Sequence, residues 1–287
     1  MILTLPDGRQ LDYRVSGPDG GTPLVFHHGT PGSVLPARSI ERAAHARGLR
    51  LVTFSRAGYG ASSRQQGRRV VDVVNDTAAV LAAIGATESY VAGWSGGGPH
   101  TLACAARLDG VKAALVIAGV APSGESDLDF LAGMGQDNLD EFGEAAAGEA
   151  RIRTYLDAAR PGLQHATAAE IITEMASLLP EVDRAVLSDE YGEDLATGYH
   201  EALRVGVDGW LDDDLAFLDD WGFGLGEIAV PTSLWQGTAD LMVPPSHGEW
   251  FARHLPQAKV TILDGEGHLS LALGELDRMM DELTRSS

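Results

Sequence analysis

The stretch VAGWSGGGPH, residues 91–100, places one serine among four glycines. The apolar residues that lead into it predict a buried strand, and the run that follows predicts a helix. A strand-to-helix turn this sharp needs small neighbours, which Gly93 and Gly97 supply, and it exposes the hydroxyl of Ser95 at the helix N-terminus. Ser95 is therefore a candidate nucleophile. A glycine-rich turn with no catalytic role can have the same sequence. Motifs elsewhere in the chain are therefore needed to choose between the two interpretations of Ser95.

Short apolar runs alternate with helix-length segments along most of the chain. Continuous runs of this kind are expected when a strand is buried on both faces. Strands that alternate with helices imply an α/β fold, with a mostly parallel sheet between two helix layers. Two stretches, residues 1–5 and 9–15, flank a Pro-Asp-Gly turn and predict an opening hairpin. The predicted buried strands are residues 23–28, 49–55, 89–94, 111–120, 231–237 and 259–265, and the predicted helices are residues 36–48, 70–85, 97–109, 244–256 and 268–285.

The alternation stops in the middle of the chain. Amphipathic helical patterns occupy that part, for example residues 149–160 and 168–179, and no strand is predicted there. We find no low-complexity linker, so we expect this insertion to pack on the rest of the chain. The predicted organisation is an α/β core of residues 1–120 and 229–287 with a helical insertion of residues 121–228.

Composition and charge limit the classes of molecule that we expect this protein to bind. The chain has 287 residues with 44% hydrophobic and 22% charged residues, which are the proportions of a globular protein. The net charge of −20 argues against a nucleic-acid partner, because phosphate binding needs clustered Lys and Arg. Residues 121–228 hold 25 acidic and 5 basic residues, which accounts for the whole surplus. We expect these carboxylates to be solvated on helix faces; the alternative is that they disfavour anionic substrates.

Targeting and cofactor signals are absent from the sequence. The first residues lack a basic start followed by an apolar stretch, and no run approaches 18 apolar residues, so we expect a cytoplasmic location and no membrane span. Cys104, the single cysteine, is expected to pack as a small apolar residue. No metal or dinucleotide motif occurs, so we expect no cofactor and no metal. Nothing in the sequence sets the oligomeric state.

A catalytic serine needs a base and an acid elsewhere in the chain. The hydroxyl becomes a nucleophile when a histidine takes its proton, and a carboxylate must orient that histidine. His247 and His254 fall in a predicted helix, where we expect a solvated face. His268 follows the last predicted strand in a loop that can reach across the sheet, so it is the expected base. Asp240 is the acid that follows the preceding strand, and it is the expected orienting group.

Acyl transfer also needs backbone donors for an oxyanion. The N–H of Gly96, at the start of the predicted helix, is one candidate. The second is expected in the loop HGTPGS, residues 28–33, where the N–H of Thr30 can point toward Ser95 and Gly29 allows a tight turn.

Other residues near the predicted site receive supporting roles. We expect His28 to brace the oxyanion loop and His100 to pack beneath the insertion. Trp94 either walls the acyl pocket or packs beneath it. Four aromatic residues of the insertion are expected to pack it onto the core: Trp210, Phe217, Trp221 and Phe223.

With these motifs in this order, the chain resembles the α/β-hydrolase superfamily, in the group with a serine nucleophile. The matching stretches are HHGTPGS, SRAGYGASS, GWSGGG, GTADLMVP and GEGHLS. The resemblance implies the α/β-hydrolase fold, the catalytic order Ser, Asp, His, and an insertion that acts as a helical cap, or lid, over the site. Ser55 departs from the Asp that many members have before R-x-G-x-G, in a loop that is usually structural.

The resemblance implies a hydrolase acting on a small-molecule substrate. A serine at the elbow argues against haloalkane dehalogenase and epoxide hydrolase chemistry, which use aspartate, so a carboxylic ester hydrolase is the broadest prediction. The alternative is a proline iminopeptidase-like enzyme, because HGTPGS is similar to that family's H-G-G-P-G and an acidic cap can hold a cationic amino terminus. That family's elbow, however, reads G-G-S-W-G. A further alternative is a ligand receptor on the hydrolase fold that turns over slowly or not at all.

Overall fold

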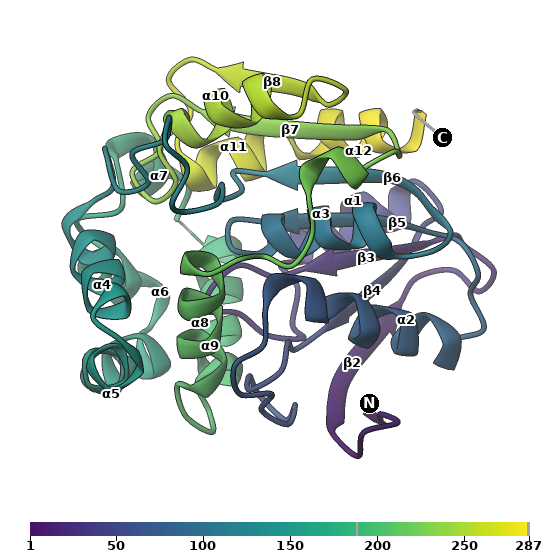
Figure 1. The fold of residues 1–287 in the computed structure, drawn as a ribbon, viewed down its shortest axis with the longest axis horizontal. Helices are drawn as coiled ribbons and strands as arrows, with labels where there is room; N and C mark the ends of the chain where they lie inside the picture. The colour runs from purple at the N-terminus through teal and green to yellow at the C-terminus, as the bar shows by residue number, and fades with distance from the viewer. Residues whose placement is uncertain (188, 286–287) are drawn as a thin grey trace.

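An eight-stranded sheet runs through the molecule (Figure 1). The computed structural model describes residues 1–187 and 189–285. The strands are β1 (Ile2–Thr4), β2 (Gln10–Ser16), β3 (Pro23–His27), β4 (Arg50–Phe54), β5 (Ser89–Trp94), β6 (Val111–Ile117), β7 (Thr232–Gly237) and β8 (Lys259–Leu263). Their order in the sheet is β1-β2-β4-β3-β5-β6-β7-β8. Strands β3 to β8 are parallel, and the opening hairpin β1–β2 joins the sheet antiparallel to β4.

The strands in the middle of the sheet are buried along most or all of their length, as the continuous apolar runs predict. Every residue of β3 and of β7 is buried. The prediction of a strand buried on both faces is wrong for β8, which is last in the sheet order and whose residues are exposed or half-buried. Ile262 of β8 is 36% exposed. An apolar run therefore marked the strand but could not reveal that it lies at the edge.

Helices cover both faces of the sheet. One apolar layer joins α2, α3 and α10 to the sheet, and a second joins α1, α11 and α12 to the opposite face. The predicted last helix is divided in two at Glu275, so residues 268–274 form α11 and residues 276–285 form α12. The bounds are α1 (Arg38–Ala46), η1 (Val70–Asp72), α2 (Val73–Ala83), α3 (Gly97–Arg107), η2 (Leu225–Glu227), α10 (Pro245–His254), α11 (His268–Gly274) and α12 (Leu276–Arg285).

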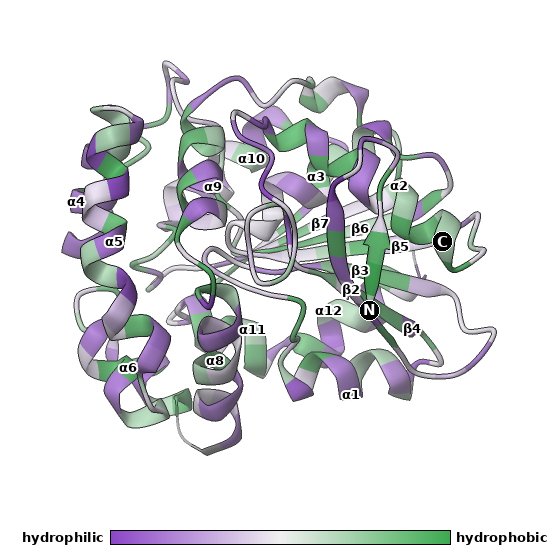
Figure 2. Ribbon diagram, turned by 90° about the horizontal axis from the view of Figure 1, so that it is seen from below, coloured by the Kyte–Doolittle hydropathy of each residue, from purple (hydrophilic) through white to green (hydrophobic). Residues whose placement is uncertain are grey.

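In the described residues between β6 and β7, where the sequence predicted a helical insertion, six α-helices precede η2. They are α4 (Gln136–Ala146), α5 (Glu149–His165), α6 (Ala168–Glu174), α7 (Glu181–Val186), α8 (Asp189–Ala202) and α9 (Asp208–Leu218). Figure 1 shows them gathered at one end of the sheet. Hydrophilic and hydrophobic residues alternate along α4, α5, α6 and α8 (Figure 2), as amphipathic helices require.

The insertion packs directly on the core. Its apolar clusters include Tyr59 from the loop after β4, Met242 from the loop after β7, and Leu269 at the start of α11. In the described ranges, no helix combines the length and the apolar character that crossing a membrane requires.

Candidate active site

Ser95 follows β5 in a backbone conformation that residues other than glycine rarely adopt. Its φ is +58°, in the left-handed region. The Ser95 N–H donates to the carbonyl of Ile117 at 2.8 Å, and the Ser95 carbonyl accepts from the N–H of Gly98 at 2.9 Å. Strain of this kind costs about 1–3 kcal/mol and persists where the surrounding structure imposes it, commonly at active sites. The turn is the sharp strand-to-helix elbow that the sequence predicts, and it places Ser95 on a cavity wall.

Two glycines make the elbow possible. A Cβ atom on Gly97 would clash with the carbonyl oxygen of His27, at the end of β3. A Cβ atom on Gly93 would clash with the hydroxyl of Thr101 and with the carbonyl of Gly97. The first turn of α3 therefore lies directly against the backbone of β3, and only glycine allows this approach.

His268 and Asp240 form a buried, hydrogen-bonded pair. His268 Nδ1 lies 2.7 Å from Asp240 Oδ2, and both side chains are fully buried. The same Oδ2 accepts from Gln236 at 3.1 Å, and Oδ1 accepts from the N–H groups of Met242 and Val243 at 2.8 and 2.9 Å. A carboxylate held this firmly keeps the proton on Nδ1 and leaves Nε2 free to accept one.

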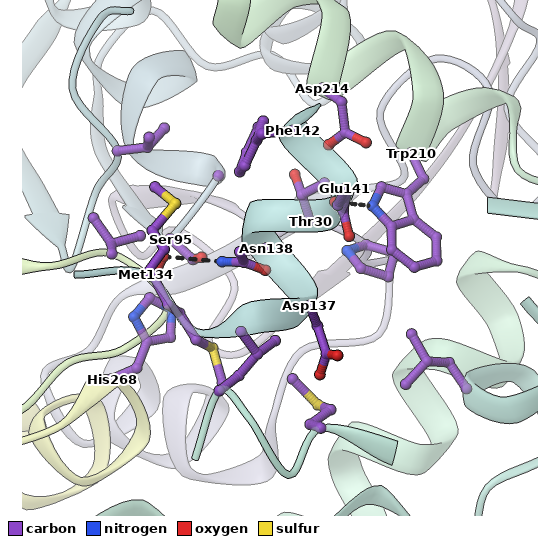
Figure 3. A pocket seen from close by; sticks show the side chains of 18 of the residues that line it. Thr30, Ser95, Met134, Asp137, Asn138, Glu141, Phe142, Trp210, Asp214 and His268 are labelled. Atoms are coloured by element: carbon purple, nitrogen blue, oxygen red, sulfur yellow. Dashed lines mark hydrogen bonds between the residues drawn. The ribbon is translucent and has the colours of Figure 1, made fainter. Parts of the chain in front are cut away.

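The second ring nitrogen of His268, Nε2, is buried and is left without a hydrogen-bond partner among the described residues. Ser95 and His268 line the same cavity, and Figure 3 shows the two side chains on one side of it. Buried polar atoms are nearly always paired, so an unpaired acceptor beside a serine is suited to general-base chemistry.

A carboxylate of the insertion fixes the backbone of His268. Asp183 of α7 accepts hydrogen bonds from the N–H groups of His268 (2.8 Å), Leu269 (3.0 Å) and Ser270 (2.9 Å). The first N–H groups of a helix have no partner within it, so Asp183 supplies the acceptor for α11. A Cβ atom on Gly267 would overlap the Asp183 carboxylate. Sequence reasoning missed Asp183, because its partners lie 85 or more residues later in the chain.

The two predicted oxyanion donors lie next to each other. A Cβ atom on Gly96 would overlap the side chain of Thr30, and both residues line the cavity together with Ser95. Gly96 is the N-cap of α3, so its N–H belongs to the group that lacks an acceptor inside the helix. This placement is compatible with an oxyanion hole, and that role stays a prediction.

His28 is bonded on both sides of its ring. Its Nδ1 donates to the Gly29 carbonyl at 2.7 Å, and its Nε2 accepts from the backbone N–H of Arg56 at 3.2 Å. Burial and the nearby Arg56 charge lower the pKa of His28 well below its usual value, so the ring is neutral. These bonds tie the loop that carries Thr30 to the loop after β4.

Trp94 touches the candidate base. Its ring centroid lies 5.0 Å from that of His268, and its Nε1 donates to the His268 carbonyl at 3.4 Å. A Cβ atom on Gly29 would lie 3.2 Å from the Trp94 ring. Trp94 also lines the cavity, so it both walls the pocket and packs against His268.

A buried aspartate of the insertion joins α9 to the oxyanion loop. Asp213 Oδ2 accepts from Arg56 (2.6 Å), Thr30 (2.8 Å) and Tyr59 (2.9 Å), and Oδ1 accepts from Arg68 (2.6 Å). Burial alone would raise the pKa of Asp213, but the two guanidinium groups hold it well below its usual range. Asp213 is thus an ionised hub, and the sequence patterns did not single it out.

His100 lies beneath this hub, as predicted. Its Nδ1 is 2.9 Å from the Gly96 carbonyl, and its Nε2 is 3.7 Å from Asp213 Oδ1. Its ring centroid is 6.0 Å from that of Phe217 on α9. Burial lowers the pKa of His100 well below its usual value, so this imidazole packs as a neutral ring.

The expectation that His247 lies on a solvated helix face is wrong. The side chain is fully buried. Its Nδ1 accepts from the N–H of Ala121 at 3.0 Å, and its Nε2 donates to the carbonyl of Phe130 at 3.0 Å. The face of α10 that carries His247 is covered by the segment that leaves β6, and residue spacing within α10 does not show this.

The expectation of solvated acidic residues is also wrong for α9. Asp212, Asp213 and Asp214 are all buried. Arginines of the core pair with the first two of them, Arg64 with Asp212 and Arg56 with Asp213. The helix lies between the other insertion helices and the core, so none of its faces points fully to solvent.

The cavity lies between the strand ends and the insertion, with a volume of about 230 Å³. Core residues on its wall include Thr30, Trp94, Ser95, Gly96, Val243 and His268. Insertion residues on its wall include Met134, Asn138, Glu141, Phe142, Trp210 and Asp214, several of which are labelled in Figure 3. Both parts of the chain therefore shape the space in front of Ser95.

Within the described part of the chain, no group of three or more His, Cys, Asp or Glu side chains is arranged to hold a metal ion. Cys104 is buried next to Thr77 and His27, and burial raises the pKa of its thiol to about 12. It packs as a small apolar residue, as the sequence predicts.

The sequence model described as the alpha/beta hydrolase fold matches residues 22–275. A non-heme haloperoxidase of Rhodococcus erythropolis is 27% identical over 279 residues, which cover 93% of this chain and 92% of that protein. A dihydrolipoyllysine-residue acetyltransferase component of the acetoin cleaving system of Pseudomonas putida is 28% identical over 91% of this chain, which spans only 62% of that protein. A hydrolase structure from Pseudomonas aeruginosa PA01 superposes with a TM-score of 0.71 at 19% identity, covering 99% of this chain and 97% of the other.

Proposed function

We propose that this chain, which belongs to the alpha/beta hydrolase fold family, hydrolyses a carboxylic ester of a small molecule through a covalent acyl-enzyme at Ser95. The observation that carries the proposal is the state of His268. Asp240 holds its Nδ1 at 2.7 Å, its Nε2 is buried and unpaired among the described residues, and His268 lines the same cavity as Ser95.

In the first half of the reaction, Ser95 Oγ attacks the ester carbonyl while His268 Nε2 takes the hydroxyl proton. Asp240 stabilises the imidazolium that forms. The carbonyl oxygen gains a negative charge, which the N–H groups of Gly96 and Thr30 would stabilise. The intermediate collapses, the C–O bond to the alcohol breaks, and His268 returns its proton to the leaving oxygen.

In the second half, water attacks the acyl-enzyme. His268 accepts one proton of the water, the carbonyl carbon passes through a second tetrahedral intermediate, and Ser95 leaves as the hydroxyl when His268 returns the proton. The products are a carboxylic acid and an alcohol. The enzyme ends in its starting state.

The insertion of residues 121–228 acts in this proposal as a cap. Its helices supply a large part of the cavity wall, so it determines which acyl and alcohol groups fit in front of Ser95. It also fixes His268 through Asp183 and the oxyanion loop through Asp213. The cap thus has a positioning role besides selecting the substrate.

The first prediction concerns Ser95→Ala. Wild type is expected to release p-nitrophenol from short p-nitrophenyl esters over many turnovers, and the variant is expected to lose about 10⁴-fold or more of kcat while still binding the ester. A fluorophosphonate should add one mass equivalent to Ser95 in the folded wild-type protein.

Three results would contradict the proposal: no adduct on Ser95, an adduct on another residue, or full turnover by the Ser95→Ala variant. A prolyl arylamide measured beside the ester separates an aminopeptidase from an esterase. If wild type forms the adduct but releases no more than one equivalent of product per site, the receptor alternative is favoured.

A further inference from the structure

The cavity has an acidic wall away from the catalytic residues. Figure 3 shows Ser95 and His268 on one side and Asp214, Glu141 and Trp210 on another. Asp214 comes from α9 and Glu141 from α4, so both belong to the insertion. The chemistry proposed for Ser95 uses neither carboxyl group.

Asp214 is a buried acid that no N–H or hydroxyl group of the described residues reaches. Its side chain is fully buried, and its carboxyl group has a side-chain hydrogen bond only with the neighbouring Glu141 carboxyl among the described residues. Glu141 also accepts from the indole N–H of Trp210 at 2.8 Å. Buried carboxyl oxygens are almost always paired, so unpaired ones on a cavity wall call for a donor that arrives with a ligand.

The two carboxyl groups interact with each other. Burial, followed by the neighbouring Glu141 carboxyl, raises the pKa of Asp214 well above its usual value. Burial raises the pKa of Glu141 to about 7. Two adjacent acids cannot both ionise without strong repulsion, so the pair loses its first proton at about pH 7 and carries one net negative charge above that pH.

Nothing cationic on the described cavity wall neutralises that charge. Four acids line the cavity, Asp137, Glu141, Glu174 and Asp214, and none of its described lining residues is Lys or Arg. The arginines nearby are committed elsewhere, since Arg68 and Arg56 both pair with Asp213. A ligand with one positive charge and several N–H donors satisfies both the charge and the empty acceptors.

We propose that the Glu141–Asp214 pair is a binding subsite for a protonated amine, so that the preferred substrate is an ester whose acyl or alcohol part carries an ammonium group. The inference rests on the proposed function for the position of the scissile bond. It adds a substrate class, because the ammonium anchors one end of the molecule in the insertion while its carbonyl reaches Ser95. Asp137 and Glu174 add negative potential to the same cavity.

The test compares matched esters. p-Nitrophenyl 6-aminohexanoate and p-nitrophenyl heptanoate differ by an ammonium in place of a methyl group, and the 6-hydroxyhexanoyl ester offers a neutral donor; a longer set ends in 8-aminooctanoyl and nonanoyl. Wild type should prefer an amino ester to its alkyl match in kcat/KM. That ratio should fall about tenfold to a hundredfold in Glu141→Gln and in Asp214→Asn.

Asp140→Asn is the matched control, because Asp140 is an exposed acid of the same helix outside the cavity. It removes the same charge and should keep the wild-type ratio. Circular dichroism and thermal melting check that each variant is folded. The two carboxamide variants keep the shape of the acids, and either one alone can test the pair.

Equal rates for amino and alkyl esters in wild type, or ratios that both variants leave unchanged, would overturn the inference while the ester hydrolase proposal stands. A preference that the hydroxy ester shares would exclude a cation as the ligand.

If no ester turns over, calorimetric titration with n-hexylammonium chloride and 1-hexanol tests the subsite directly. Binding of the amine that both variants weaken supports the subsite, and equal affinity for amine and alcohol removes it.

Discussion

At position 97 the backbone of a neighbouring strand leaves room only for glycine. The Cβ of any other residue would overlap the His27 carbonyl oxygen, an atom of β3 that cannot move without moving the sheet. Ser95 stands two residues earlier, with its φ at +58°. The position of the candidate nucleophile therefore depends on the absence of a Cβ atom at Gly97, in the first turn of α3.

Gly97→Ala is predicted to damage stability and activity together. The added methyl group must push α3 away from β3, which we expect to cost about 1–3 kcal/mol of unfolding free energy. Because a displacement of about 1 Å in a catalytic group lowers rates about a hundredfold, ester turnover should fall by at least that factor. Urea denaturation and p-nitrophenyl ester assays on the same preparation measure both quantities.

Gly143→Ala is the matched control for that substitution. Gly143 lies in α4, and a Cβ atom there meets nothing within 4 Å. Alanine is a better helix former than glycine, so this variant should gain about 0.5–1 kcal/mol of unfolding free energy. A Gly97→Ala variant that behaves like Gly143→Ala would show that the close approach of α3 to β3 is not needed.

At the scale of elements, α9 connects the insertion to the core. Eight of its eleven residues are buried, among them three successive aspartates. Its Asp213 is shared by Arg56 and Arg68 of the core and by the Thr30 hydroxyl of the oxyanion loop. Helix and loop are thus held by one carboxylate.

Asp213→Ala is predicted to lower the unfolding free energy by about 3–5 kcal/mol, because it leaves two buried guanidinium groups without their counterion. In the folded fraction, kcat should fall by a larger factor than KM rises, because Thr30 loses the acceptor that orients it. Denaturant unfolding and steady-state kinetics measure these effects. Asp219→Asn, an exposed position just after α9, should stay within about 0.5 kcal/mol of wild type.

An Asp213→Ala variant within 1 kcal/mol of wild type would mean that the ion pairs give no net stability. A variant that is destabilised but keeps the wild-type kcat would leave the hub a structural role and remove the link to Thr30.

The elements differ in how far the sequence could predict them. Parallel strands were recognisable by their continuous apolar runs, and the candidate residues Ser95, Asp240 and His268 each follow such a run, although the run before His268 belongs to the exposed edge strand β8. The burial of α9 was not predictable, because an aspartate is expected to face solvent unless its buried partner is known. Arg56 and Arg68 precede Asp213 by 157 and 145 positions, and no local pattern carries contacts over that distance.

At the scale of the whole molecule, buried ionisable groups oppose one another in their response to pH. Burial lowers the pKa of four histidines, to about 3 for His27 and about 4 for His247, and well below the usual value for His28 and His100. The unfolded chain binds protons at these rings below about pH 6.5, whereas the folded chain does not. The carboxyl pair acts in the other direction, because burial lets folded Glu141 and Asp214 keep protons that the unfolded chain releases above about pH 4.5.

Burial also raises the pKa of Asp76 and Asp212, so these carboxyls, like the pair, offset part of the proton uptake by the four imidazoles of the unfolded chain. The imidazoles still leave the unfolded state with more bound protons between about pH 5 and 6, so the unfolding free energy should rise with pH there. Glu141→Gln should steepen this rise, since a group whose folded pKa is raised stabilises the protein at low pH and loses that contribution as pH passes about 7. The slope should increase by about 1.4 kcal/mol per unit between about pH 5 and 7, and more if Asp214 then ionises at lower pH. Urea denaturation of both proteins at half-unit steps of pH measures the difference, with Asp140→Asn as the exposed control. A wild-type stability that is flat or falls with rising pH would contradict the neutral burial of the histidines, and parallel curves for wild type and Glu141→Gln would contradict the raised pKa of Glu141.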